Sequence, residues 1–303
     1  MGNVVAKGEL FAPEVVTDIF SKVRGKSSIA KLANQIPVAF SGNDVFTCSL
    51  DNEVNIVAEN GAKTNGGATA NTVQIVPIKV EYGARVSDEF LYASDEKKLQ
   101  MLQEFNDGYA KKIARAIDIM GFHGVNPRTQ LASTAIGTNS LDTNTDVNEE
   151  TYDATNVYGN LEDAVEALGD YDATGIVMDK TFAKLLSTKT IGQTAPFAEF
   201  ALGGNPGAVM GIPADVNSTV AFKVKANAQA TAAAVAHAYV GDFQNAYKWG
   251  YAKDMTFEVI PYGDPDNTGA DLKGHNQVFL RAEAYIGWGI LDPKAFAAVK
   301  VGE

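Results

Sequence analysis

Alternating apolar and polar side chains over residues 43–86 predict two long β-strands that form an extended hairpin. Successive side chains of a strand point to opposite faces, so apolar residues of one parity give each strand a single apolar face. In the first strand these residues are Phe46, Cys48, Leu50, Val54, Ile56 and Ala58. In the return strand they are Val76, Ile78, Val80, Tyr82, Ala84 and Val86.

Two details modify the predicted return strand. Val73 and Ile75 have the opposite parity, which indicates a bulge or twist near Val76. Pro77 has no N–H to donate to a neighbouring strand, so it favours a position at the edge of a sheet.

The predicted tip, residues 59–71, contains no large apolar side chain that could anchor it to its own core. Strands of about 15 residues would extend about 50 Å, and an isolated two-stranded ribbon is only marginally stable in water. The apolar face, including Ile78 and Val80, is therefore predicted to contact a neighbouring subunit. The alternative is an ordinary hairpin that packs on the chain's own sheet.

A long amphipathic helix is predicted over residues 94–121. Ser94 is a suitable N-cap, and Gly121 and Gly124 supply stop signals. The apolar residues recur at steps of three and four and are Leu99, Leu102, Phe105, Tyr109, Ile113, Ile117 and Met120. At about 1.5 Å per residue, this helix is a rod of roughly 40 Å.

The segments around these elements predict a mixed α and β protein. Residues 8–37 read as an arm with two short helices, the first opened by Pro13 and the second by Ser27 or Ser28. A polar loop over 128–157 precedes an α/β unit over 158–240. Two helix caps are predicted there at Asn160 and Asp179, with a buried strand over 175–178 and a long, exposed loop over 189–207. Further strands are predicted near 209–213, 238–241, 256–261 and 278–286.

Composition narrows the functional classes. The 303 residues are 46% hydrophobic, which is ample for a packed core, and contain neither a secretion signal nor an apolar run of about 18 residues. The net charge of −12 argues against tight binding of nucleic acid. The single cysteine, Cys48, excludes disulfides within the chain and metal sites built from several cysteines.

Motifs for chemistry are incomplete. Gly25-Lys26-Ser27 resembles the end of a phosphate loop, but Phe20 stands where the first glycine belongs. Two segments, starting at Asp142 and at Asp264, have the opening rhythm of a calcium loop but lack the final Glu, and solvated turns are the favoured interpretation. His123, His237 and His275 match no metal-binding spacing. We therefore predict no catalytic, cofactor-binding or metal-binding residue.

Several segments in order resemble the major capsid proteins of tailed bacteriophages of the Hong Kong 97 type, nearly from end to end. These segments are Leu10–Val15, Ser27–Pro37, Val57–Lys63, Ile78–Leu91, Gly211-Ile212-Pro213, Gly241-Asp242-Phe243, Ala246-Tyr247, Phe279-Leu280-Arg281 and Asp292–Phe296. No single segment is a sharp motif, but together their order and spacing are specific.

The resemblance implies an α+β fold of the Hong Kong 97 type. Its parts would be an N-terminal arm (1–40), an extended hairpin loop (41–86), an axial domain (158–240), and a peripheral domain with a long spine helix (87–157 and 241–303). Candidate contacts between subunits are Glu59, Lys63, Ile78, Val80 and Arg85.

The implied function is that of a structural protein without catalytic activity. Its copies would form hexamers and pentamers of an icosahedral shell in the bacterial cytoplasm. The implied partners are other copies of the chain, a portal, packaged double-stranded DNA without sequence-specific binding, and a separate scaffolding protein, because the arm starts almost at Met1. Some family members link a lysine at the loop tip to a neighbour's asparagine. Lys63 matches that lysine, but a plain charged residue is the favoured interpretation.

Two rival classes stay open at this point. An encapsulin-like compartment shares the fold but encloses enzymes as cargo. A monomeric α+β enzyme or ligand-binding protein would need a deep pocket with convergent polar groups and a hairpin that packs on its own chain.

Overall fold

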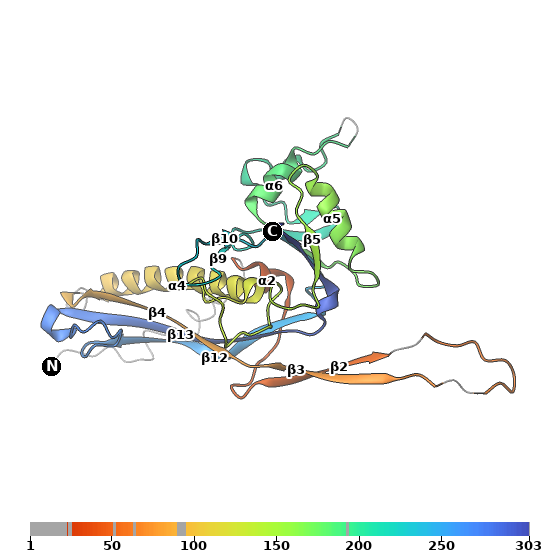
Figure 1. Cartoon of the computed structure of the whole chain (residues 1–303). Helices are drawn as coiled ribbons and strands as arrows, with labels where there is room; N and C mark the ends of the chain where they lie inside the picture. The colour runs from red at the N-terminus through yellow and green to blue at the C-terminus, as the bar shows by residue number, and fades with distance from the viewer. Residues whose placement is uncertain are drawn as a thin grey trace.

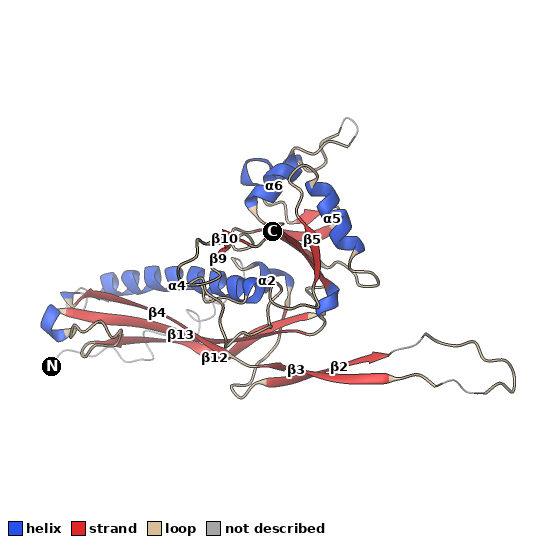
Figure 2. Ribbon diagram, in the orientation of Figure 1, coloured by secondary structure: helices blue, strands red, loops and turns tan. Residues whose placement is uncertain are grey.

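The computed structural model describes residues 23, 26–50, 53–62, 65–89, 95–191 and 194–302. Its elements form a sheet with a long helix along it, a second sheet with two shorter helices, and a hairpin that projects away from both (Figures 1 and 2). Among the described residues, no helix has the length and apolar character needed to cross a membrane.

The first sheet has the strand order β1-β12-β13-β4, and the helix α4 (Asp95–His123) lies along it. The strands are β1 (Asn34–Gln35), β12 (Tyr247–Ile260), β13 (Gln277–Ile290) and β4 (Ile78–Ser87). The buried face of α4 joins Ala284, Ile286 and Trp288 of β13 in one core. On the helix side this core contains Tyr109, Ile113, Ile117 and Met120, and Phe105 packs against it. Leu102 lies in a smaller cluster with Val278 and Leu280, so the predicted apolar stripe is confirmed from Leu102 to Met120.

The ends of α4 refine the sequence prediction. The helix ends at His123, and Gly124 follows with a φ of +67°, which confirms it as the stop signal. Gly121 lies inside the helix, and a Cβ there would come within 2.4 Å of the Tyr247 hydroxyl. It is therefore a close-packing residue and no stop signal. Ser94 and the first predicted arm helix lie outside the described residues.

The second sheet has the order β5-β14-β11-β6-β8-β7, and the helices α5 (Val157–Glu166) and α6 (Lys180–Ser187) pack on it. Its strands are β5 (Asn148–Thr151), β14 (Phe296–Lys300), β11 (Ala236–Gly241), β6 (Gly175–Met178), β8 (Ile212–Val216) and β7 (Ala208–Val209). Because β5 and β14 complete this sheet, it extends beyond the predicted range of 158–240.

Short elements connect these layers. A small ladder pairs β9 (Lys223–Val224) with β10 (Ala233–Ala234). Single turns of 3₁₀-helix occur at η1 (Ala198–Gly203), η2 (Lys273–His275) and η3 (Pro293–Ala295).

The helix caps were predicted with mixed success. Asp179 caps α6 and accepts hydrogen bonds from the backbone N–H groups of Thr181 and Phe182, as expected. The cap of α5 is Asn156 and not Asn160. Asn160 lies buried within the helix and donates from its side chain to the carbonyl of Asp153.

The hairpin is shorter than the sequence predicts. Its strands are β2 (Asn43–Leu50) and β3 (Ala68–Ile75), eight residues each, and among the strands that the structure describes they pair only with one another. The next strand, β4, belongs to the first sheet. The change of parity after Ile75 therefore marks the break between two sheets, and Val76 and Pro77 lie in this break. The predicted bulge within a single strand is wrong. The predicted boundary of 41–86 is corrected to 43–75.

A buried carboxylate joins three distant segments of the chain. Asp118 of α4 is fully buried and accepts five hydrogen bonds of 2.6–3.1 Å from the arm and from the loop after β8. The donors are the Ser27 hydroxyl, the backbone N–H groups of Ser28 and Ile29, the Asn217 amide and the Thr219 hydroxyl. Ser27 also caps the helix α2 (Ser28–Leu32), as predicted. Asp118 therefore links the arm, the long helix and the loop after β8.

We expect Asp118→Asn to lower the free energy of unfolding by about 2–4 kcal/mol at pH 7, because an amide NH₂ cannot accept the donors that both carboxylate oxygens now accept. Urea unfolding of the unassembled chain measures this. Asp146→Asn, at an exposed position, is the control and should change stability by less than about 0.5 kcal/mol.

The same variant has a pH signature. Burial raises the pKa of Asp118 to about 6, while its hydrogen bonds act in the opposite direction. An unfolded Asp titrates near 4, so the folded state gains a proton first as the pH falls, and the contribution of Asp118 to stability grows between about pH 7 and 4. The stability difference between wild type and Asp118→Asn should therefore widen on acidification. An equal or shrinking difference would contradict this assignment.

Candidate assembly surfaces

The projecting hairpin exposes one apolar face. Because Cys48 pairs with Ala70, the even-numbered residues of both strands share a face. On that face Phe46 is 78% exposed and Leu50 is 77% exposed, and Cys48 is exposed as well. Figure 2 shows that the far ends of both strands extend beyond the first sheet, and the exposure of Phe46 and Leu50 shows that the chain's own core does not cover this face. The predicted apolar face is present on β2.

The tip of the hairpin adds further apolar surface. Residues 53–62 form no strand, and within them Val54 is 95% exposed and Ile56 is 97% exposed. A turn closes where the N–H of Gly61 donates to the carbonyl of Ala58. The candidate contact Glu59 is exposed within this turn. Lys63 lies outside the described residues.

Ile78 and Val80 are placed differently from the prediction. They lie on β4, where Ile78 pairs with Ile286 and Val80 with Ala284 in the chain's own sheet. Both are partly buried and pack against the core around α4. Their apolar alternation serves that core, so the expectation that they lie on the projecting hairpin is wrong.

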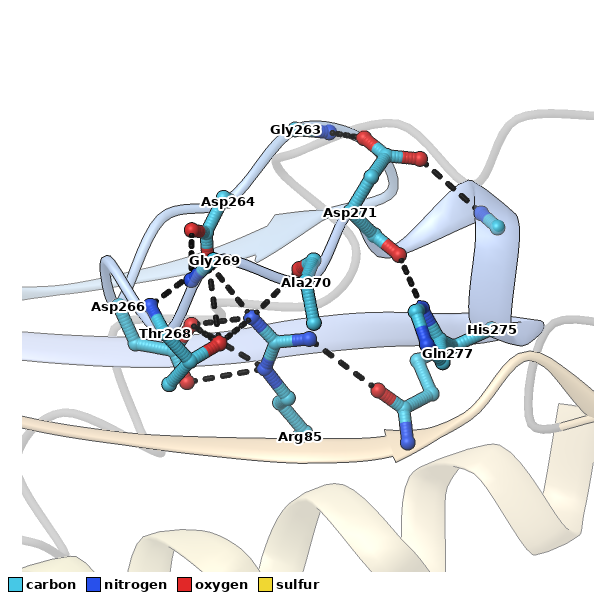
Figure 3. A network of polar contacts seen from close by, with 11 residues as sticks. Arg85, Gly263, Asp264, Asp266, Thr268, Gly269, Ala270, Asp271, His275 and Gln277 are labelled. Carbon is cyan, nitrogen blue, oxygen red and sulfur yellow. Dashed lines mark hydrogen bonds and ion pairs between the residues drawn. The ribbon is translucent and has the colours of Figure 1, made fainter.

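Arg85 is also bound within its own chain. Its guanidinium enters the loop between β12 and β13 and donates to the carboxylates of Asp264 and Asp266, to the Thr268 hydroxyl and to the carbonyl of Ala270 (Figure 3). Only 17% of its side chain is exposed. Within the subunit, Arg85 thus holds this loop in place as an internal latch, and its role as a contact between subunits stays a prediction.

This latch explains the resemblance of the loop to a calcium site. The residues of the incomplete motif converge on a cation, but that cation is the guanidinium of Arg85. Hydrogen bonding to Arg85 lowers the pKa of Asp266 to about 2. The side chain of Asp264 also accepts from the N–H groups of Thr268 and Gly269, which closes the loop on itself.

The other calcium-like segment is tied to a histidine. Asp142 lies 2.6 Å from Nδ1 of His123 and accepts a 2.8 Å hydrogen bond from the Tyr239 hydroxyl. The Nε2 atom of His123 lies 2.9 Å from the carbonyl oxygen of Thr219, and the ring is completely buried. This trio resembles catalytic machinery but joins the end of α4 to β11. His237 contacts Asp179, and His275 contacts the backbone of its own loop.

One exposed surface was only partly anticipated. The sequence predicts an exposed loop over 189–207, and within it Leu202 is fully exposed with a φ of +57°. Met210, just beyond the loop, is 70% exposed with a φ of +50°. Large apolar residues seldom adopt positive φ, and no sequence pattern identifies them in advance. Both are therefore exposed apolar side chains in or next to the loop between α6 and β8.

A sheet with a long helix, a second α/β domain and a projecting hairpin define a Hong Kong 97-like capsid fold. The family model described as the phage capsid family matches residues 7–301. The chain therefore belongs to the phage capsid family. No curated protein matches it.

Solved structures agree with this assignment. A structure from Mycobacterium phage Ogopogo is 30% identical, with a TM-score of 0.75, and the match covers 91% of this chain and 92% of that one. One from Gordonia phage Cozz is 23% identical, with a TM-score of 0.72 and coverage of 92% and 87%. A chain from the capsid of a native GTA particle is 18% identical, with a TM-score of 0.60 and coverage of 91% and 90%.

The Arg85 latch yields a prediction. We expect Arg85→Lys to release residues 263–277, because one ammonium cannot replace a planar group that donates to several acceptors at once. Amide hydrogen exchange of peptides from this loop should accelerate by about tenfold, which corresponds to about 1.4 kcal/mol of local stability. Arg281→Lys, at an exposed ion pair with Glu258 in the same sheet, is the control. Unchanged exchange in the loop would show that Arg85 does not hold it.

Proposed function

We propose that this chain is the major capsid protein of a tailed bacteriophage or prophage and that its hairpin lies on an adjacent subunit of the shell. The single observation that supports this most is the exposed apolar face of the hairpin. An exposed, contiguous apolar surface on a soluble protein marks an interaction site. Hexamers and pentamers of an icosahedral shell would supply the covering surface.

The energetics suit an assembly built from many modest contacts. Complete burial of a side chain such as Phe46 or Leu50 contributes about 1.5–3 kcal/mol before the costs of association. One hairpin therefore gives no tight pairwise complex. In a closed shell each subunit donates a hairpin and receives one, so the contacts reinforce each other.

The proposed partners follow from this role and from charge. A net charge of −12 suits double-stranded DNA that is enclosed and not bound by sequence. A separate scaffolding protein, a portal and assembly in the host cytoplasm are parts of the same proposal. A covalent link through Lys63 stays a prediction.

The two rivals are less well supported. The family match is to phage capsid proteins, which favours a virus shell over an encapsulin-like compartment. The hairpin extends away from the body of the chain, which disfavours a self-contained monomer. A hollow of about 300 Å³ beside α6 is lined by Ala154, Thr155, Val157, Leu185, Thr188, Lys189 and Thr190. Of these side chains only Lys189 is titratable, so the lining offers no acid–base pair.

The single cysteine provides a direct test of the hairpin contact. We expect the Cys48 thiol to react with a small thiol reagent in the unassembled chain and to lose at least 90% of that reactivity in shells, because its face becomes covered. Reactivity should return on denaturation of the shells. In a Cys48→Ser background, Asn71→Cys places the thiol on the opposite face and is the matched control. Equal reactivity of Cys48 in both states would contradict the proposal.

Charge substitutions separate assembly from folding. Phe46→Asp should abolish shells in coexpression with the scaffolding protein and leave the unfolding free energy of the subunit within about 0.5 kcal/mol, since Phe46 contacts little of its own chain. Ile78→Asp should instead lower the yield of folded subunit, because it places a charge against the core around α4. Electron microscopy and urea unfolding measure the two effects. Normal shells from Phe46→Asp would exclude a role for this face.

A further inference from the structure

The base of the hairpin, here called its root, comprises Val73 and Ile75 of β3 and packs against glycines of β13. Residue Ile75, the last of β3, is completely buried, and it packs over Gly287 and Gly289 of β13. These glycines lie on the face of β13 opposite to Ile286 and Trp288, which pack in the core around α4. The hairpin root and the long helix thus occupy opposite faces of one strand.

The hairpin root leaves no room for a side chain at Gly287 or Gly289. A Cβ on Gly289 would lie 2.8 Å from Cγ1 of Ile75 and 3.3 Å from Cγ1 of Val73. A Cβ on Gly287 would lie 3.0 Å from Cγ2 of Ile75 and 3.1 Å from Cγ1 of Val38. Non-bonded carbon atoms prefer about 3.5–4.0 Å, so any side chain at either glycine must displace the root.

The chain that enters the hairpin packs on glycines of the same sheet. Gly250 of β12 pairs with Gly287, and a Cβ there would lie 2.0 Å from the carbonyl oxygen of Ile36. Val38 is buried between these two glycines. Both ends of the hairpin therefore cross glycine backbone on β12 and β13.

Side-chain packing, without a backbone ladder, holds the hairpin at this point. The described strands β2 and β3 pair only with each other, and no ladder joins either to β13. The turn that leads into β2 is closed by Asn43, whose side chain accepts from the N–H of Ala39 and donates to the carbonyl of Pro37. Asn43 thus closes the turn at the base of the hairpin, and the direction of the hairpin depends on how Val73 and Ile75 pack on the glycines.

We propose that Gly287 and Gly289 are positioning residues that set the angle at which the hairpin projects toward a second copy of the chain. This inference rests on the proposed role of the hairpin in assembly. It assigns to two glycines of the sheet a part in the contact between subunits, although neither lies on the hairpin.

The geometry amplifies a small change. Relief of the 2.8 Å contact moves Ile75 by about 1 Å. With a pivot two residues away, at about 7 Å, and a strand of eight residues spanning roughly 25 Å, the far end of β3 moves by about 4 Å. A displacement of that size is enough to misplace Phe46 and Leu50 on a close-packed partner surface.

The test measures the angle directly in unassembled subunits. Spin labels on Cys48 and on Lys111→Cys, an exposed position of α4, report the distance between hairpin and body by pulsed electron resonance. We expect Gly289→Ala to shift the mean distance by several ångströms and to reduce the yield of normal shells at least tenfold. Adding Ile75→Ala, which deletes the clashing Cγ1 atom, should return the distance to that of Ile75→Ala alone.

Two further variants serve as a control and as a substitute for Gly289→Ala. Gly83→Ala creates a clash with Phe279 at 2.1 Å in the same sheet but away from the root, so it should destabilise the subunit without changing the distance. Gly287→Ala introduces a milder clash and serves if Gly289→Ala does not fold. An unchanged distance in the glycine variants, or a shift that Ile75→Ala does not reverse, would overturn the proposal.

The result is separable from the proposed function. If the wild-type chain forms no shells with its scaffolding protein, the capsid role fails, yet the distance measurement still tests the seat of the hairpin. If shells form normally from a Gly289→Ala chain whose hairpin has moved, the glycines do not control assembly and the further inference fails alone.

Discussion

A two-stranded ribbon has no second layer, and this constraint connects the fold of the subunit to its assembly. Among the described residues, the buried part of the hairpin is its root, where Ile75 packs against β13. Farther out, the face with Phe46 and Leu50 has no partner in the described chain. Alternation in the strands thus separates two tasks, since odd-numbered residues at the root hold the hairpin and even-numbered residues beyond it remain available for a neighbour.

Buried polar groups have the complementary task of joining segments that are remote in sequence. Asp118 brings together the arm, the long helix and the loop after β8, and Asp142 joins the end of that helix to β11. Arg85 holds the loop between β12 and β13. The groups around Asp142 and Arg85 resemble fragments of a catalytic site and of a metal site. Their partners are satisfied inside the subunit, so their contribution is to fix its shape.

Periodicity was sufficient to predict the elements that pack along their whole length. The stripe from Leu102 to Met120 predicted α4, and Asp179 predicted the start of α6, because helix spacing and capping depend on local sequence. The hairpin was harder to delimit. Residues 76–86 alternate just as residues 46–58 do, and alternation does not reveal whether the covering layer belongs to the same chain. Ile78 and Val80 were misplaced for that reason.

The candidate contacts show the same limit. Arg85 has no sequence signal that pairs it with Asp264 and Asp266, which are about 180 residues away, although the incomplete calcium motif did indicate a site that favours a cation. The role of the glycines beneath the hairpin root could not be predicted from the sequence either, because a glycine in a strand can mark a bulge, a bend or a close approach of another segment. Only the arrangement in space distinguishes these uses.

The location of the hairpin root has a mechanical consequence. β13 is an inner strand of the first sheet, flanked by β12 on one side and β4 on the other. The covalent chain, however, enters the hairpin from β1 and leaves it into β4, the two outermost strands of this sheet. A pull along the ribbon therefore loads the single ladder that holds each of these edge strands, whereas a push at the base is transmitted through Ile75 to β13, which two ladders anchor.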